Sequence, residues 1–90
     1  MLGSVVVILN MFIEPKELEK VTETLTSMPE VLDIYEVTGE YDLVSLVRTE
    51  SISTFREFLK NKILRIKGVR STVTSVVLHT HKKEGKLISG

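Results

Sequence analysis

The fold is organised around the stretch Val37-Thr38-Gly39-Glu40-Tyr41-Asp42-Leu43-Val44. Gly39 permits a backbone turn that most residues resist, and three side chains with hydrogen-bonding groups follow it directly. On each side of this stretch lie an apolar run, a helical pattern, a turn and a second apolar run. We therefore expect a chain reversal here, at the centre of the fold, and we treat it as a candidate functional site.

The two halves of the chain repeat one pattern. Val5 to Leu9 corresponds to Leu43 to Val47, 38 residues later (43 − 5). The same offset pairs further apolar residues, namely Val21 with Leu59, Leu25 with Ile63, Met28 with Ile66 and Val31 with Val69. An offset shared by strand, helix and turn predicts a repeated βαβ unit. The fold class is then α+β, a ferredoxin-like βαββαβ sandwich with a four-stranded antiparallel sheet and two helices on one face.

The strands differ in polarity, which predicts their places in the sheet. Val5 to Leu9 and Leu43 to Val47 are unbroken apolar runs, so we place them side by side at the centre. Asn10 to Ile13 is expected to lead out of the first strand. Val31 to Thr38 is mixed on both faces, with Leu32 and Ile34 on one of them, and therefore reads as an edge strand. Arg70 to His81 predicts a long last strand.

The helices are predicted from apolar residues three and four positions apart. The first begins at Glu14-Pro15, since proline suits the first helical position, and ends before Pro29. The second begins at Ser51 or at Thr54, which are competing N-caps. It ends near Gly68, expected in a left-handed conformation.

Composition limits the function. The chain of 90 residues has 12 basic and 12 acidic side chains, so its formal net charge of zero lacks the electrostatic footprint of a nucleic-acid-binding domain. It has no cysteine, and no apolar run approaches the roughly 18 residues of a membrane span. We expect a cytoplasmic protein with no membrane contact and no direct DNA binding. A single domain over residues 1–81 and a loosely held polar tail over residues 82–90 are expected.

The inner strands are apolar on both faces, whereas two helices cover only one. The second face needs another cover. A second copy of the chain is the simplest one, and this predicts a dimer formed through the sheets.

Candidate ligand-binding groups lie in the central turn and on the last strand. Glu40 and Asp42 supply carboxylates for an ammonium group, and the backbone N–H groups around Gly39 suit a carboxylate, so the turn fits a small zwitterion. The alternative is a solvated β-turn, because these residue types occur in turns for conformational reasons alone. The last strand offers hydroxyl groups on Ser71, Thr72, Thr74 and Ser75. Threonine is also a good strand residue on a half-exposed face.

Signals for metal binding and catalysis are missing. His79 and His81 lie at strand spacing on one face, but the chain has no third histidine to complete a metal site with them. The chain has no phosphate-binding glycine loop and no nucleophile or metalloprotease motif. We expect no metal, no cofactor and no enzymatic activity. A small enzyme with Asp42 or Glu40 as a base in a buried pocket stays open as an alternative.

Three segments in this order carry a family resemblance: Pro29-Glu30-Val31, Thr38-Gly39-Glu40-Tyr41-Asp42-Leu43, and Gly68-Val69 followed by Thr72-Val73-Thr74-Ser75. Together they resemble the effector-sensing RAM domain of the Lrp/AsnC transcription regulators, over nearly the whole chain from Val5 to about Leu78. No segment would be persuasive by itself.

The resemblance implies a function and a site. Members are βαββαβ domains that dimerise through their sheets, commonly assemble into octamers, and bind effectors, typically amino acids, between dimers. It implies ligand-binding roles for residues at the turn and on the last strand, namely Gly39, Glu40, Tyr41, Asp42, Thr72, Thr74 and Ser75.

A full regulator of this family has an amino-terminal helix-turn-helix domain, which does not fit before Val5. We therefore expect a stand-alone sensing module whose partner is a full-length Lrp/AsnC regulator. The remaining alternatives are a small enzyme of the dimeric α+β barrel type and a purely structural assembly module.

Overall fold

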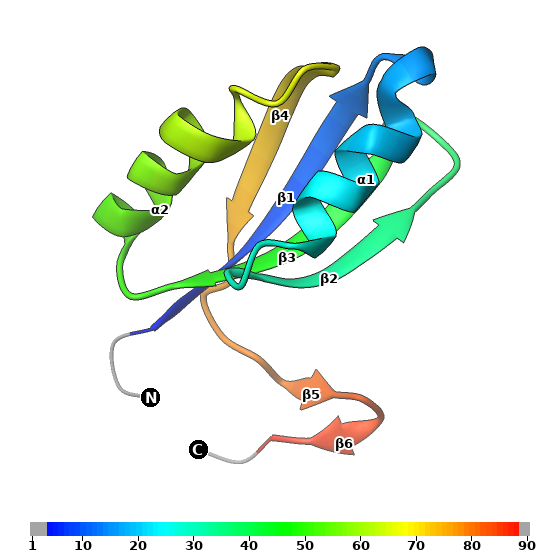
Figure 1. The fold of residues 1–90 in the computed structure, drawn as a ribbon. Coiled ribbons are helices and arrows are strands. Elements are labelled where there is room, and N and C mark those ends of the chain that lie inside the picture. The colour runs from blue at the N-terminus through cyan, green and yellow to red at the C-terminus, as the bar shows by residue number, and fades with distance from the viewer. Residues whose placement is uncertain (1–3, 89–90) are drawn as a thin grey trace.

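The computed structural model describes residues 4–88. Figure 1 shows a four-stranded sheet with two helices packed on one face and a small hairpin beyond the sheet. In chain order the elements are β1 (Val5–Ile13), a 3-10 turn η1 (Pro15–Glu17), α1 (Leu18–Thr26), β2 (Val31–Glu36), β3 (Leu43–Thr49), α2 (Ile52–Phe58), a π-helical turn η2 (Leu59–Ile63), β4 (Val69–Val76), β5 (Lys82–Lys83) and β6 (Lys86–Leu87).

The sheet confirms the predicted ferredoxin-like arrangement. Its strand order is β2-β3-β1-β4, and β1 pairs antiparallel with both β3 and β4. The continuous apolar runs therefore lie side by side at the centre, and β2 is an edge strand, as their polarity predicts. The repeat also holds, because β1 and β3 begin at Val5 and Leu43, and β2 and β4 begin at Val31 and Val69.

The first strand is longer than expected, since it continues through Asn10 and ends at Ile13. Its alternate residues Val7, Leu9, Met11 and Ile13 are all buried under the helices. They meet Val21 and Leu25 of α1 and Phe55 and Phe58 of α2 in one core. The prediction that Asn10 to Ile13 leads out of the strand is wrong because the period-two burial pattern runs on to Ile13.

The edge strand β2 contains an irregularity, and because of it some side chains lie on the opposite face of the sheet from the one predicted. Its register against β3 shifts between Val31 and Asp33. An extra residue in a strand changes which side chains face the core. Val31 and Ile34 therefore pack against the core, while Leu32 is 41% exposed. The prediction that Leu32 and Ile34 share one face is wrong, and β2 ends at Glu36 rather than Thr38.

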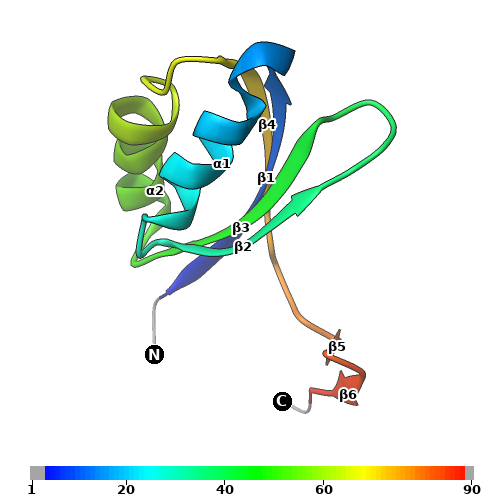
Figure 2. The ribbon, with the colours of Figure 1, turned by 45° about the vertical axis from the view of Figure 1, so that its right-hand side comes forward.

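The last strand is shorter than expected, because β4 ends at Val76 and not at His81. Beyond it, β5 and β6 pair antiparallel through a turn in which Glu84 and Gly85 have positive φ values of 49° and 79°. This hairpin stands where a loosely held tail was expected. Residues 89 and 90 of that predicted tail lie outside the described residues. Figure 2 shows the hairpin projecting beyond the sheet, on the side away from α1 and α2.

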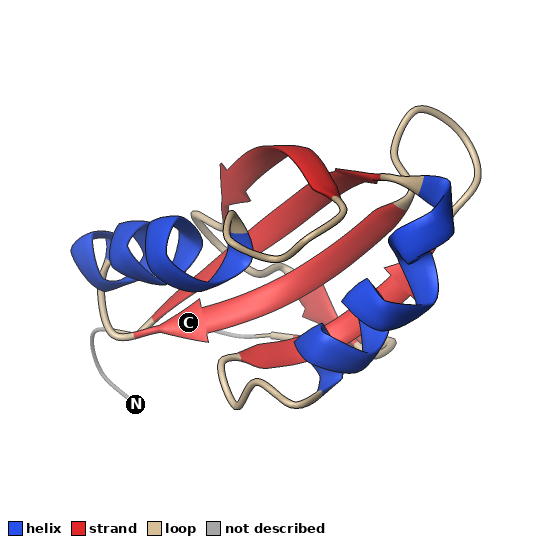
Figure 3. Cartoon of the chain, turned by 45° about the horizontal axis from the view of Figure 1, so that its top comes forward, coloured by secondary structure: helices blue, strands red, loops and turns tan. Residues whose placement is uncertain are grey.

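Local signals place both helices. Pro15 opens the 3-10 turn that precedes α1. At α2 the Thr54 N–H donates to Ser51 Oγ over 3.1 Å, so Ser51 rather than Thr54 is the N-cap. Figure 3 shows both helices on one face of the sheet. None of the helices in residues 4–88 is long and apolar enough to cross a membrane.

The turn into β4 depends on Gly68. Its φ of 104° confirms the expected left-handed conformation, and a Cβ added there would lie 2.3 Å from Glu17 Cβ. Glu17 Cβ is fixed to the backbone of η1 and cannot swing away. Gly39 has a similar φ of 109°, but a Cβ there meets nothing within 4 Å. A substitution at Gly39 would therefore introduce backbone strain alone, whereas one at Gly68 would introduce both strain and steric overlap.

We predict that Gly68→Ala lowers the free energy of unfolding by about 2 to 4 kcal/mol, because left-handed strain and overlap with Glu17 add together. The matched variant Gly39→Ala carries only the strain, about 1 kcal/mol. Urea unfolding of both variants measures the difference. Equal losses in the two variants would contradict the close packing of Gly68 on Glu17.

Candidate functional site

The predicted turn connects β2 to β3 at one end of the sheet. Gly39 adopts the positive φ that the sequence predicts. The Val37 N–H donates to the Asp42 carbonyl oxygen over 3.1 Å and closes the base of the turn. Gly39 and Glu40 are exposed at its tip, which leaves the Glu40 carboxylate free to meet a ligand in solvent.

Asp42 fastens this turn to the end of β1. Its N–H donates to the Met11 carbonyl oxygen over 3.0 Å. Its Oδ2 accepts from the Ile13 N–H over 2.7 Å. A short bond from a backbone N–H to a carboxylate is stronger than one between neutral groups. One carboxylate oxygen therefore has a structural role, and Asp42 serves as a clip between the turn and β1.

Tyr41 packs on Phe12, with 5.0 Å between ring centroids and 59° between ring planes. Both residues are half-buried, so the pair forms an apolar wall beside the polar turn. Phe12 is absent from the predicted site because Asn10 to Ile13 was expected to lie outside the strand. The alternation of apolar residues through Met11 and Ile13 is the signal that would have placed Phe12 on β1, on the face away from the helices.

The last-strand candidates do not lie together. Thr72 is opposite Met11, and Thr74 is opposite Leu9, so both are on the helix side of the sheet. Ser75 is opposite Ile8 and lies on the other face. Thr72 and Asp42 flank the end of β1 from opposite sides, two strand spacings or about 10 Å apart. Of the three predicted site residues on the last strand, Thr72 is therefore the nearest to the turn.

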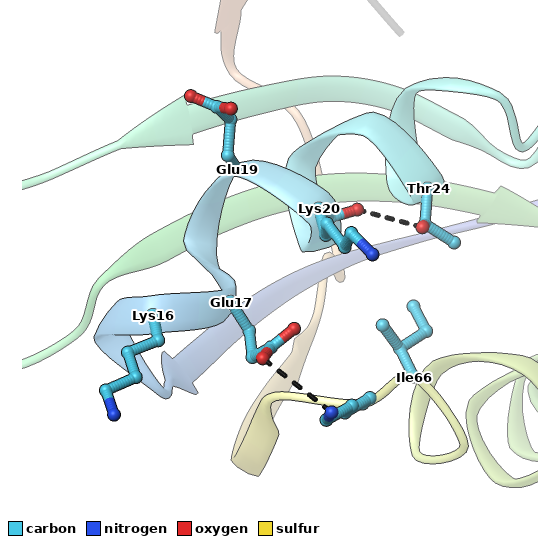
Figure 4. A pocket seen from close by; sticks show the side chains of 7 residues that line it. Lys16, Glu17, Glu19, Lys20, Thr24 and Ile66 are labelled. Atoms are coloured by element: carbon cyan, nitrogen blue, oxygen red, sulfur yellow. Dashed lines mark hydrogen bonds and ion pairs between the residues drawn. The ribbon is translucent and has the colours of Figure 1, made fainter.

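The surface hollows lie elsewhere. Five hollows on the surface of the described residues lie away from the turn, and one of them, with a volume of about 480 Å³, lies between α1 and the segment that enters β4 (Figure 4). It is lined mainly by exposed lysine and glutamate side chains, with Lys67 Nζ 4.0 Å from Glu17 Oε2. None of the seven predicted site residues lines any of these five hollows. The predicted site thus lies outside these five hollows.

The two histidines follow β4. Their rings meet edge to face, with 4.6 Å between centroids. Across residues 4–88, no group of three or more histidine, cysteine, aspartate or glutamate side chains is arranged to hold a metal ion. Among these described residues, the pair therefore lacks a third ligand.

Comparison with known proteins gives one consistent family. Residues 6–87 match the family described as the Lrp/AsnC ligand binding domain. The chain is 32% identical over 83 residues to the HTH-type transcriptional regulator Ptr1 of Methanocaldococcus jannaschii, a stretch that is 92% of this chain and 56% of that protein. The chain spans about half the length of the curated relatives it matches.

Two solved structures share the fold. E. coli AsnC superposes with a TM-score of 0.81 at 30% identity, covering 84% of this chain and 52% of AsnC. The regulator NMB0573 of Neisseria meningitidis, solved as an L-Met complex, superposes with a TM-score of 0.85 at 23% identity, covering 93% of this chain and 56% of that one.

The clip formed by Asp42 generates a prediction. We expect Asp42→Ala to lower the free energy of unfolding by about 1 to 2 kcal/mol, because the Ile13 N–H loses its acceptor. Asp42→Asn keeps an oxygen at that position and should lose less than half as much. Urea unfolding gives the energies, and amide hydrogen exchange at Ile13 reports the bond itself. Equal losses in both variants, or an Ile13 amide that stays protected in Asp42→Ala, would contradict the clip.

Proposed function

Because the chain belongs to the family of Lrp/AsnC ligand-binding domains, we propose that it senses a small molecule, an amino acid or similar metabolite, in transcriptional or metabolic regulation. Its curated relatives are named as transcriptional regulators, which favours a role in regulation over catalysis and supports our proposal that the protein acts in the cytoplasm. NMB0573, which has the same fold, was solved with L-Met, and this makes amino acids the first ligands to test.

The clipped turn is the observation that carries the proposal. Glu40 is exposed, Tyr41 and Phe12 form an apolar wall, and Asp42 holds the turn in place. An amino acid has matching parts, since its ammonium group suits the Glu40 carboxylate and its side chain suits the aromatic wall. Gly39 supplies backbone N–H groups that suit the ligand carboxylate. Thr72, opposite Met11, lies on the other face of the sheet from the aromatic wall, so its predicted contact with the ligand has no support from the geometry of one chain. Thr74 and Ser75 lie on opposite faces of the sheet and farther along β4, so their predicted roles in binding also have no support from the geometry of one chain.

The open surface of this site favours completion by another copy. A small-molecule site normally surrounds most of its ligand. The tip of the turn is exposed, and the turn lies outside the five hollows described above, which favours a ligand that one chain leaves partly open to solvent. We place the ligand where a neighbouring subunit approaches Tyr41 and Asp42. This agrees with an assembly of dimers, and an octamer is the assembly we propose.

The uncovered sheet face supports the dimer. Its centre consists of half-buried aliphatic side chains from the two inner strands: Val6, Ile8, Val44 and Leu46. Asn10 is the one polar residue among them on β1, and its Nδ2 donates to the Val73 carbonyl oxygen over 3.3 Å. Soluble monomers rarely expose a continuous apolar surface of this kind. We propose that two copies pack these faces together, and that a full-length relative joins them in mixed assemblies.

Two alternatives, a small enzyme and a purely structural module, fit these features less well. An enzyme of the dimeric α+β barrel type needs a titratable group inside the dimer, whereas the centre of this face is aliphatic. A purely structural module has no use for an exposed carboxylate beside an aromatic wall. Ligand binding accounts for both features.

Thermal unfolding in the presence of each amino acid tests the proposal. A true ligand at 100 times its Kd should raise the free energy of unfolding by about 2.7 kcal/mol. Glu40→Gln removes the charge without touching the turn backbone, and we expect it to weaken binding at least about tenfold, as for a lost hydrogen bond to a charged group.

Glu23→Gln is the matched control, because Glu23 is an exposed glutamate on α1, and we expect no change in binding for it. If no amino acid stabilises the protein and it binds no full-length regulator, the proposed function is wrong. If Glu40→Gln binds as well as Glu23→Gln, the function stands and the site is misplaced.

A further inference from the structure

The two repeats of the chain carry opposite charge, although the net charge is zero. Residues 14–30 hold five acidic and two basic side chains, whereas residues 56–70 hold six basic side chains and one acidic. Each ion pair within residues 4–88 joins these two segments: Lys62 with Glu30, Lys67 with Glu17, and Arg70 with Glu14. Three of the six cations therefore hold the second repeat to the first.

The other three cations of that segment, Arg56, Lys60 and Arg65, have no ion pair among the described residues. Arg56 and Lys60 are four positions apart where α2 continues into η2, so their side chains are neighbours on one face of the helix. Both are exposed, because Phe55 and Phe58 occupy the core side. Two adjacent positive charges thus face solvent with no role in holding the chain together.

These two cations line a hollow of about 390 Å³ on the outer face of α2 and η2. The other residues that line it are Ser53, Glu57, Leu59 and Leu64. The Glu57 carboxylate already has a partner, since its Oε1 accepts from Asn61 Nδ2 over 3.0 Å. The hollow therefore has a net positive charge, and the Ser53 hydroxyl adds a further hydrogen-bond donor.

The π-helical turn supplies the apolar part of this hollow. The Leu64 N–H donates to the Leu59 carbonyl oxygen over 2.8 Å, five residues back instead of the four of an α-helix. Both leucines line the hollow. Leu59 packs against the core, whereas Leu64 is 49% exposed and has apolar surface left to bury. Short π-helical turns are frequent at functional sites.

We propose that this hollow binds a small organic acid, a carboxylate with a short aliphatic chain. The carboxylate lies between the Arg56 guanidinium and the Lys60 ammonium group, where charge-assisted hydrogen bonds hold it. The aliphatic chain covers Leu64. An amino acid fits less well, because its ammonium group would lie beside the same two cations.

This site is separate from the one in the proposed function. Figure 1 shows α2 on the side of the molecule away from the turn between β2 and β3. The two sites also differ in charge, since the turn offers the exposed Glu40 carboxylate and the hollow offers Arg56 and Lys60. The two ligands therefore differ in whether they carry an ammonium group.

NMR titration of the full chain with isocaproate tests the proposal, because isocaproate is leucine without its ammonium group. We expect saturable shifts of the backbone amides of residues 56–64. Leucine and the neutral isocaproamide should bind there at least ~10-fold more weakly, since one adds a positive charge and the other lacks the negative charge.

Variants of the hollow test its two parts. Arg56→Gln with Lys60→Gln should weaken isocaproate binding at least ~10-fold, as for a lost hydrogen bond between charged groups. The matched control is Arg65→Gln with Lys83→Gln, which removes one arginine and one lysine outside the hollow and should leave binding unchanged.

Leu64→Ser should weaken binding roughly fivefold, because about half of a leucine side chain loses its apolar contact. Leu32→Ser is its control, since Leu32 is 41% exposed but lies on β2, and it should have no effect.

The outcomes separate this site from the proposed function. The site is overturned if residues 56–64 show no saturable shift, or if the two double variants weaken binding equally. Equal binding of leucine and isocaproate in the hollow overturns the ligand class. Isocaproate shifts confined to residues 39–42 also overturn the hollow but leave the proposed function intact. If instead no amino acid binds while isocaproate shifts residues 56–64, the hollow stands and the proposed amino-acid site is wrong.

Discussion

One constraint governs this molecule: its central strands are apolar on both faces, and the two helices can cover only one. On the covered face, Leu9 and Val47 are completely buried. On the other face, Ile8 and Leu46 are half-exposed between the same strands. Burial of apolar surface is the main favourable term in folding, and a chain of 90 residues has little of it to spare. A domain of this size therefore gains by pairing its free face.

The candidate site and the uncovered face are physically linked through β1. Phe12, on the uncovered side of that strand, supports Tyr41, while the neighbouring Ile13 N–H holds the Asp42 carboxylate. A contact between two copies at the uncovered sheet face can therefore affect the conformation of the turn through β1. Ligand binding at the turn and dimerisation through the uncovered face would both act on Phe12 and Ile13 of β1. An assembly could therefore respond to the ligand through this strand.

The sequence was sufficient for the elements whose patterns are regular. The offset that pairs Val5 with Leu43 and Val31 with Val69 predicted the repeated βαβ unit and the strand order that follows from it, although β4 starts at Val69, one residue before the predicted Arg70. Bulges and ends were not predictable in this way. The irregularity at Leu32 depends on pairing with β3, and β4 leaves the sheet after Val76, opposite Val7, although β1 extends to Val5. The grouping of Tyr41 with Phe12, and the separation of Thr72 from Ser75, likewise depend on register.

Self-association through the uncovered face is the central claim, and methyl NMR tests it most directly. Spectra of the methyl-labelled protein would be recorded from micromolar to millimolar concentration with a soluble paramagnetic agent. We expect the signals of Val6, Ile8, Val44 and Leu46 to shift and to become protected from the agent as concentration rises, while those of the helix-side core residues Val21 and Leu25 stay constant. Equal accessibility of the first group at every concentration would contradict the claim.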